Sequence, residues 1–180
     1  MQLNGIFIIA ELTGEIAEKI RAINERYDPR LARYKPPHIT LTGSSGVGPI
    51  PPFVRVEEIR EKLEPVTSAI APITASFLPP QRFMQTDIIV LPLDSHGPVR
   101  ALHDGIITSG LPFARARYTF SPHCTLSLYQ TLDADSRREL LKVRITEPFV
   151  ISSIQLHQSR DPQPSTKLLE LPLTGEPEKT

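Results

Sequence analysis

A short motif occurs twice in this chain, and it constrains the fold more than any other feature. The segment at 37–41 reads Pro-His-Ile-Thr-Leu, and the segment at 122–126 reads Pro-His-Cys-Thr-Leu. Side chains alternate between the two faces of an extended strand, so the histidine and the threonine of each copy project from one face. The repeat therefore predicts two related halves whose motif strands meet at one site.

The segments before the two motifs follow the same order. Apolar, β-branched runs at 5–12 and 86–93 are typical of buried strands. Each is followed by apolar residues at helical spacing, which predict helices at about 14–27 and 96–109. From the end of the apolar run to the motif histidine, the chain advances 26 positions in the first half and 30 in the second. The order strand, helix, motif strand thus occurs twice and supports an internal duplication.

The remaining segments complete a mixed α+β pattern. We expect loops at 28–37 and 42–52, a helix at about 53–70 interrupted or kinked by Pro65, and a short helix capped by Asp133 or Asp135 that ends near Val143. Further strands are expected at 73–78, 149–157 and 167–173, the last two joined by a proline-rich loop, and a frayed tail at 175–180. The prediction is a single bilobal α+β domain over residues 1–180, with two pseudo-symmetric lobes and a central cleft between antiparallel sheets.

Charge and cysteine content limit the partners and the compartment. Twenty basic and twenty acidic residues cancel, so the chain lacks the field of a non-specific nucleic-acid binder, and a nucleotide or RNA end is an easier substrate than long duplex. The single cysteine allows no internal disulfide, and no apolar run approaches the roughly 20 residues that span a bilayer. Met1 to Leu12 resembles a first strand more than a signal peptide. We expect a cytoplasmic monomer with no membrane partner.

Two histidines and two threonines at one site suit phosphodiester chemistry without a metal or another cofactor. Histidine titrates near pH 6.5, so one imidazole can deprotonate water while the other protonates the leaving oxygen. The threonine hydroxyls can donate to phosphate oxygens where charge develops. A 2′,3′-cyclic phosphate is one such substrate. The reverse reaction would join a 5′-hydroxyl to the cyclic phosphate, and these residues alone do not separate hydrolysis from ligation.

The paired motifs resemble the signatures of the 2H phosphoesterase superfamily, which includes the 2′-5′ RNA ligase-like proteins and the cyclic phosphodiesterases. The resemblance covers nearly the whole chain and implies a bilobal α+β fold with metal-independent cleavage of a cyclic phosphate or a 2′-5′ linkage. Carried over by position, it implies catalytic roles for His38, Thr40, His123 and Thr125. Some relatives place a basic residue just after the second motif, whereas residues 126–129 contain none.

Six further residues flank the motifs and are candidate substrate contacts. Arginine and lysine can bind phosphate, and tyrosine can stack on a base. The candidates are Tyr34 and Lys35 before the first motif, Arg115, Arg117 and Tyr118 before the second, and Tyr129, which shares the strand phase of His123. The alternative for each is a solvated loop residue.

Other chemistry-bearing residues have simpler interpretations. The glycine-rich segment 43–48 lacks the Lys-Ser/Thr ending of a phosphate-binding P-loop. Cys124 alternates with the motif residues and is expected to be a small buried side chain. His96 and His103 are seven apart on a helix, too far for a metal pair, and His157 is expected outside the site, with a position bordering it as the alternative.

Two other functions remain open from the sequence. One is a binding module of the same fold that holds an RNA end or nucleotide without turning it over. The other is a metal-dependent hydrolase that uses some of the five histidines, although the chain shows no close spacing of metal ligands.

Overall fold

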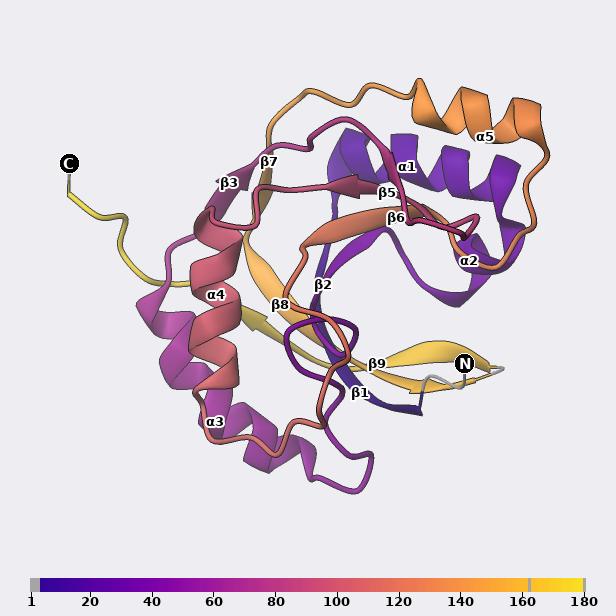
Figure 1. Cartoon of the computed structure of the whole chain (residues 1–180). Helices are drawn as coiled ribbons and strands as arrows, with labels where there is room; N and C mark the ends of the chain where they lie inside the picture. The colour runs from indigo at the N-terminus through magenta and orange to yellow at the C-terminus, as the bar shows by residue number, and fades with distance from the viewer. Residues whose placement is uncertain (1–3, 162, 180) are drawn as a thin grey trace.

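One seven-stranded antiparallel sheet forms the centre of the protein in the computed structural model, which describes residues 4–161 and 163–179 (Figure 1). The strand order is β4-β5-β6-β2-β1-β8-β9, and β3 and β7 form a second, two-stranded sheet. The strands are β1 Asn4–Glu11, β2 His38–Thr42, β3 Ile73–Ala75, β4 Gln81–Arg82, β5 Ile89–Pro92, β6 His123–Ser127, β7 Phe149–Ile151, β8 Ser153–Arg160 and β9 Gln163–Pro172. The expected mixed α+β class is confirmed, and the two halves meet where β2 pairs with β6.

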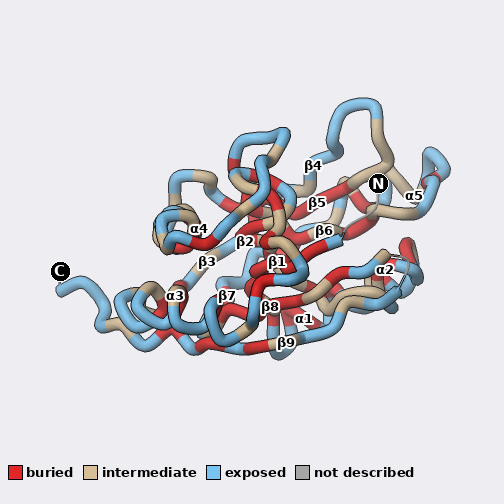
Figure 2. The backbone as a smooth tube through the Cα atoms, turned by 90° about the horizontal axis from the view of Figure 1, so that it is seen from below, coloured by how far each residue is buried: buried red, intermediate tan, exposed pale blue. Residues whose placement is uncertain are grey.

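Within residues 4–161 and 163–179, five helices accompany the sheet: α1 Gly14–Tyr27, α2 Pro29–Tyr34, α3 Val56–Ala69, α4 Pro98–Ile107 and α5 Ala134–Leu141. Apolar side chains of α1, α3, α4 and α5 join one hydrophobic core with Ile39, Leu41, Cys124 and Leu126 of the central strands. Buried positions run along β1, β5 and β8 as well as along β2 and β6 (Figure 2). One face of β2 and β6 is thus committed to the core, and the motif histidines lie on the other. None of the helices in the described part of the chain is long and apolar enough to cross a membrane.

The two halves repeat each other in strand register. Each motif strand pairs with the apolar strand of its own half, β2 with β1 and β6 with β5. The pairs correspond one to one: Glu11–His38 with Pro92–His123, Ala10–Ile39 with Leu91–Cys124, and Ile9–Thr40 with Val90–Thr125. Each ladder then shifts by one residue, so that Thr42 lies opposite Ile8 and Ser127 opposite Ile89. This common irregularity is a β-bulge that adds one residue to each motif strand. The duplication inferred from the motifs therefore extends to the backbone.

The structure differs from the expected elements at several places. The expected loop at 28–37 contains α2, because Asp28 accepts a hydrogen bond from Leu31 N as the N-cap and proline is favoured at the first helical position. The helix α3 continues through Pro65 to Ala69. The strand expected at 73–78 ends at Ala75, and the one expected at 149–157 is two strands, β7 and β8. The other expected helices and strands are present, with ends shifted by a few residues.

Some expectations fall outside what the structure describes. The expected first strand includes Met1 to Leu3, the proline-rich connection includes Pro162, and the expected tail ends at Thr180; these residues lie outside the described ranges. Just before the expected tail, Thr174 N donates to Thr67 O, and at its first residue Gly175 N donates to Ile70 O. The single domain over 1–180 and the flexible tail stay predictions.

Candidate active site

The two motif strands lie side by side, which brings their histidines and threonines to one surface. Ile39 pairs with Cys124 in antiparallel register. Counting one residue either way along both strands from this pair, His38 lies beside Thr125 and Thr40 lies beside His123. We call the sheet face that carries these four side chains the site face. All four are partly exposed, whereas the residues between them are buried.

Each histidine is oriented by a backbone carbonyl two residues before it. His38 Nδ1 lies 2.7 Å from Pro36 O, and His123 Nδ1 lies 2.7 Å from Ser121 O. A carbonyl oxygen can only accept, so this contact assigns the proton of each neutral imidazole to Nδ1. The lone pair then lies on Nε2 in both rings. Both halves thus present a base of the same tautomer to the site face.

Burial keeps both imidazoles neutral in the free protein. Burial, with the positive charge of Lys35, lowers the pKa of His38 to about 3. Burial also lowers the pKa of His123 below its usual value. Both rings can therefore accept a proton at neutral pH, and one must gain a proton before it can act as an acid. A bound phosphate would favour that protonation, because a nearby negative charge stabilises the imidazolium.

The floor of the site is apolar. Ile9 pairs with Thr40 and Val90 pairs with Thr125, and both side chains are fully buried. Phe7, two residues before Ile9 on β1, lies on the same face and is also buried. The Lys35 ammonium lies 4.6 Å from the centre of the Phe7 ring. Burial lowers the pKa of Lys35 to about 8, and the positive charge of Lys35 acts on His38.

Each half also supplies a polar anchor to the motif strand of the other half. Asn24 on α1 donates from Nδ2 to Thr125 O at 3.2 Å and to Leu126 O at 2.9 Å. His103 on α4 places Nδ1 2.7 Å from Leu41 O. Both anchors are buried. These crossed anchors satisfy carbonyl groups of β2 and β6 and fix the two strands relative to the helices.

Tyr34, Lys35 and Tyr129 lie on segments that approach each other at the end of α2. The rings of Tyr34 and Tyr129 meet edge-on with centroids 5.8 Å apart, and the Arg30 guanidinium lies 4.3 Å from the centre of the Tyr129 ring. The sequence reasoning set Tyr129 on the same strand face as His123. That reason is wrong, because the bulge in β6 breaks the alternation before the strand ends. Instead, Asp28 Oδ2 accepts from the backbone N–H groups of Leu128 and Tyr129, each at 2.7 Å.

The three candidates before the second motif lie elsewhere. Arg115, Arg117 and Tyr118 are all exposed, on a segment that runs beside residues 43–48. Gly46 N donates to Tyr118 O, and the Arg117 guanidinium lies over the Tyr118 ring. Their described contacts are with that segment and with each other, so their roles in substrate binding stay predictions.

Cys124, His103 and His157 are all buried and contact other parts of the protein. Cys124 is buried on the core side, and burial raises the pKa of its thiol to about 12. His103 is a buried anchor whose ring stacks on Phe120. His157 is buried beside the site, with Nε2 2.7 Å from Glu11 Oε1. It lies on the site face because it pairs with Phe7 of β1. Alternation along β8 agrees, because Ile154 and Leu156 of that strand belong to the core and His157 has the opposite phase.

One neighbour of the motif histidines was missed by the sequence reasoning. The Phe83 ring meets the His123 ring edge-on, with centroids 5.4 Å apart. Phe83 follows β4, a two-residue strand that the expected pattern did not include. The available signal was the apolar pair Phe83-Met84 between a proline pair and a polar turn.

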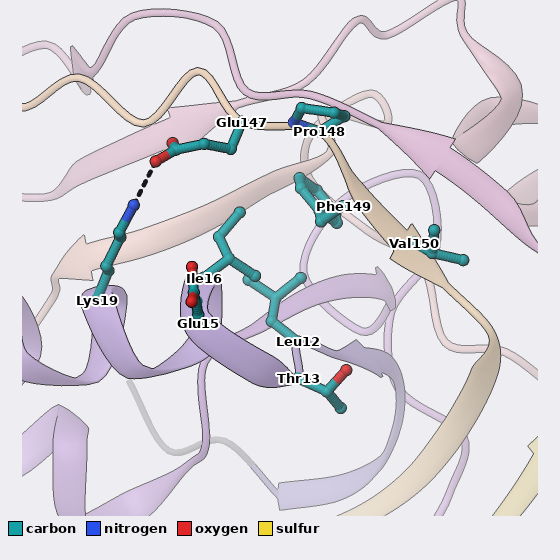
Figure 3. Close-up of a pocket in the computed structure, with 9 residues that line it drawn as sticks. All are labelled: Leu12, Thr13, Glu15, Ile16, Lys19, Glu147, Pro148, Phe149 and Val150. Atoms are coloured by element: carbon teal, nitrogen blue, oxygen red, sulfur yellow. Dashed lines mark hydrogen bonds and ion pairs between the residues drawn. The ribbon is translucent and has the colours of Figure 1, made fainter.

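A pocket of about 260 Å³ lies away from the motifs, between the start of α1 and the start of β7 (Figure 3). Leu12, Ile16 and Phe149 form its apolar side, and Lys19 pairs with Glu147 at its rim. The motif residues do not line this pocket. Among the residues that the structure describes, no cluster of three or more His, Cys, Asp or Glu side chains is arranged to hold a metal ion.

Comparisons with known proteins give the family and the fold. The model of the 2′-5′ RNA ligase superfamily matches residues 12–163. Escherichia coli LigT complexed with ATP has a similar fold, with a TM-score of 0.57 and 16% identity over 97% of this chain and 99% of that one. LigT complexed with 3′-AMP gives 0.57 and 18% over the same shares. TT0787 of Thermus thermophilus gives 0.61 and 17% over 98% of this chain and all of that one. None of the curated proteins matches the chain.

Proposed function

The chain belongs to the 2′-5′ RNA ligase superfamily of 2H phosphoesterases, and we propose that it is a metal-independent phosphodiesterase that opens a 2′,3′-cyclic phosphate or a related cyclic nucleotide or 2′-5′ linkage. The catalytic residues in this proposal are His38, Thr40, His123 and Thr125. The same site run in reverse would join a 5′-hydroxyl to a cyclic phosphate, as an RNA ligase does.

One observation carries the proposal: the two histidines have matching local surroundings. Both have Nδ1 held by the carbonyl two residues earlier, and both leave Nε2 to the site face. Diagonal neighbours on paired strands are about 7–8 Å apart, which leaves room for a phosphate between the two rings. Water attack and departure of the leaving oxygen occur on opposite sides of phosphorus, and the paired rings match that requirement.

The proposed reaction transfers one proton from water to one imidazole and one proton from the other imidazole to the leaving oxygen. The neutral imidazole accepts a proton from water as the water oxygen bonds to phosphorus. The protonated imidazole donates its proton to the 2′ or 3′ oxygen as that P–O bond breaks, which leaves a phosphomonoester. The Thr40 and Thr125 hydroxyls donate to the non-bridging oxygens, where negative charge increases. After one turnover the two rings have exchanged protonation states, and a proton exchange with solvent resets them.

The positive charge of Lys35 near His38 supports the proposal that the substrate is an anion. The second motif has no basic residue after it, but the Lys35 ammonium lies over the Phe7 ring and acts electrostatically on His38. It can supply the positive charge that the second motif lacks. The LigT structures complexed with ATP, 3′-AMP and NADP+ support a nucleotide as the substrate class.

The test is turnover of 2′,3′-cyclic nucleotides in the presence of a chelator. The wild-type protein should release a nucleoside monophosphate, and His38→Ala and His123→Ala should each lose activity by at least about 100-fold, the scale of one acid or base catalyst. His96→Ala is the matched control, since His96 lies in the turn before α4, outside the site. Full activity in either motif variant, or activity only with added metal, contradicts the proposal.

The second candidate is a binding module that holds a nucleotide without turning it over. The neutral state of both imidazoles in the free protein favours it, because no acid is present before substrate binds. Tight binding of a cyclic nucleotide with no product after long incubation would select this alternative.

A further inference from the structure

The hairpin between β4 and β5 reaches over the site face. In the sheet, β4 is separated from β6 by β5. The ring of Phe83, directly after β4, nevertheless lies against the His123 ring of β6. A side chain two strands away makes this contact only if the hairpin bends over the intervening strand. Phe83 is therefore part of the wall of the site on the His123 side.

The turn that presents Phe83 is held in one conformation. Phe83 O accepts from Thr86 N at 3.2 Å and from the Thr86 hydroxyl at 2.7 Å. Gln85 has a φ of 61°, the left-handed conformation that a tight turn requires at this position and that few side chains adopt. Asp87, at the base of the turn, accepts from Arg137 at 3.0 Å. The turn is thus preorganised and tied to α5.

This rigid turn exposes apolar side chains to solvent. Phe83 is 37% exposed and Met84, at the tip, is 89% exposed. Exposed apolar surface on a fixed element beside a polar site is typical of a surface that a ligand covers. Aromatic rings and the polarisable thioether both make favourable contacts with flat π-systems.

We propose that Phe83 and Met84 form the surface on which the nucleobase of the substrate stacks. This rests on the proposed function, because it takes the phosphate to lie between His38 and His123. The base is joined to the 2′,3′ phosphate through a single ribose, so it must lie within a sugar's length of the histidines, and Phe83 is in contact with one of them. Neither side chain offers a strong hydrogen-bonding group to the edge of a base. The surface therefore accepts any base and favours purines, whose stacking area is larger.

The test compares a substrate that has a base with one that lacks it. The probes are adenosine 2′,3′-cyclic phosphate and the cyclic phosphate of 1-O-methylribose. The ratio of kcat/KM for the first probe to that for the second should fall about 10-fold in Phe83→Ala and less in Met84→Ala, in keeping with the loss of one base–aromatic stack. Phe83→Trp should restore the ratio, and Phe53→Ala, which removes an exposed phenylalanine outside the site, should leave it unchanged.

The outcomes separate this inference from the function on which it rests. If Phe83→Ala lowers kcat/KM equally for both probes, Phe83 only positions His123 and the base-stacking proposal is wrong. If wild type turns over neither probe, the phosphodiesterase proposal fails, and binding of adenosine 3′-phosphate against ribose 3-phosphate decides the stacking proposal. Stacking then requires a preference for the adenosine compound that Phe83→Ala removes, and equal binding overturns it.

Discussion

Asp28 should be the most sensitive polar residue outside the catalytic set. Its carboxylate is fully buried and accepts three backbone N–H groups, from Leu31 at 3.1 Å and from Leu128 and Tyr129 at 2.7 Å each. One side chain thus caps α2 and holds the chain that leaves β6. Asp28→Asn is the sharpest perturbation, because it keeps the shape and one oxygen while it replaces the other oxygen with an NH₂ group.

The expected loss follows from the hydrogen bonds that asparagine cannot make. Asparagine is a good N-cap, so its oxygen can keep the bond from Leu31 N. Its amide group would then face the N–H groups of Leu128 and Tyr129, donor against donor. A hydrogen bond to a charged group contributes about 1.5–3 kcal/mol, so the loss of two should lower the free energy of unfolding by about 3–6 kcal/mol. That is a large share of the roughly 5–15 kcal/mol of a typical domain.

Urea denaturation measures the free energy, and native-state hydrogen exchange locates the change. The amides of Leu128 and Tyr129 should lose protection in Asp28→Asn more than amides in α4 do. Asp133→Asn is the matched control: Asp133 caps α5 through one bond, from Ser136 N, and it is exposed, so its loss should be much smaller. A loss below about 1 kcal/mol for Asp28→Asn, or unchanged protection at 128 and 129, would refute this account.

Three further predictions concern the two motif strands. Thr40→Val and Thr125→Val should each lower kcat by about 100-fold or more with little change in stability, as removal of an oxyanion donor does; steady-state kinetics would show an unaltered kcat if the hydroxyls do not contact the phosphate. The pKa values of His38 and His123 are lowered, so each ring stays neutral at pH values at which an exposed histidine is already protonated. The acidic limb of the kcat/KM profile should therefore lie below about pH 6.5, and a limb above about pH 7 would contradict the burial effect. Below about pH 6.5 the unfolded chain binds more protons than the folded one, so the free energy of unfolding should fall as pH drops towards 3. Burial raises the pKa of the Cys124 thiol to about 12, so iodoacetamide at about pH 8 should modify the protein only after urea unfolds it, as mass spectrometry can show.

The motif and its strand phase were enough to predict the centre of the fold. Alternation set the two histidines and threonines on one face, and the apolar residues between them to the core, as the structure shows. Helical periodicity located α1 and α4, since each has apolar residues on one side over several turns. These predictions succeeded because they depend on local geometry that the sequence pattern expresses directly.

The missed features depend on contacts between distant segments. The bulges at Leu41 and Leu126 interrupt the alternation, and neither position holds a glycine or proline that would indicate a bulge. Strict alternation therefore predicts the wrong strand phase for Tyr129. The place of Phe83 beside His123 depends on how the hairpin bends over β5, which strand propensity does not specify. Lys35 and Asp28 take their roles from partners on other strands or far along the chain, and no local signal shows such partners.

The crossed anchors mean that neither half is a folding unit by itself. The helix that satisfies the carbonyl groups of β6 comes from the first half, and the helix that satisfies Leu41 O comes from the second. A chain cut between the halves would leave a buried backbone acceptor without a donor in each piece, and each piece would carry a single motif histidine. We therefore expect the two halves to fold cooperatively. A single ancestral half could have met the same requirement only as a homodimer, with each copy's helix reaching over the motif strand of the other.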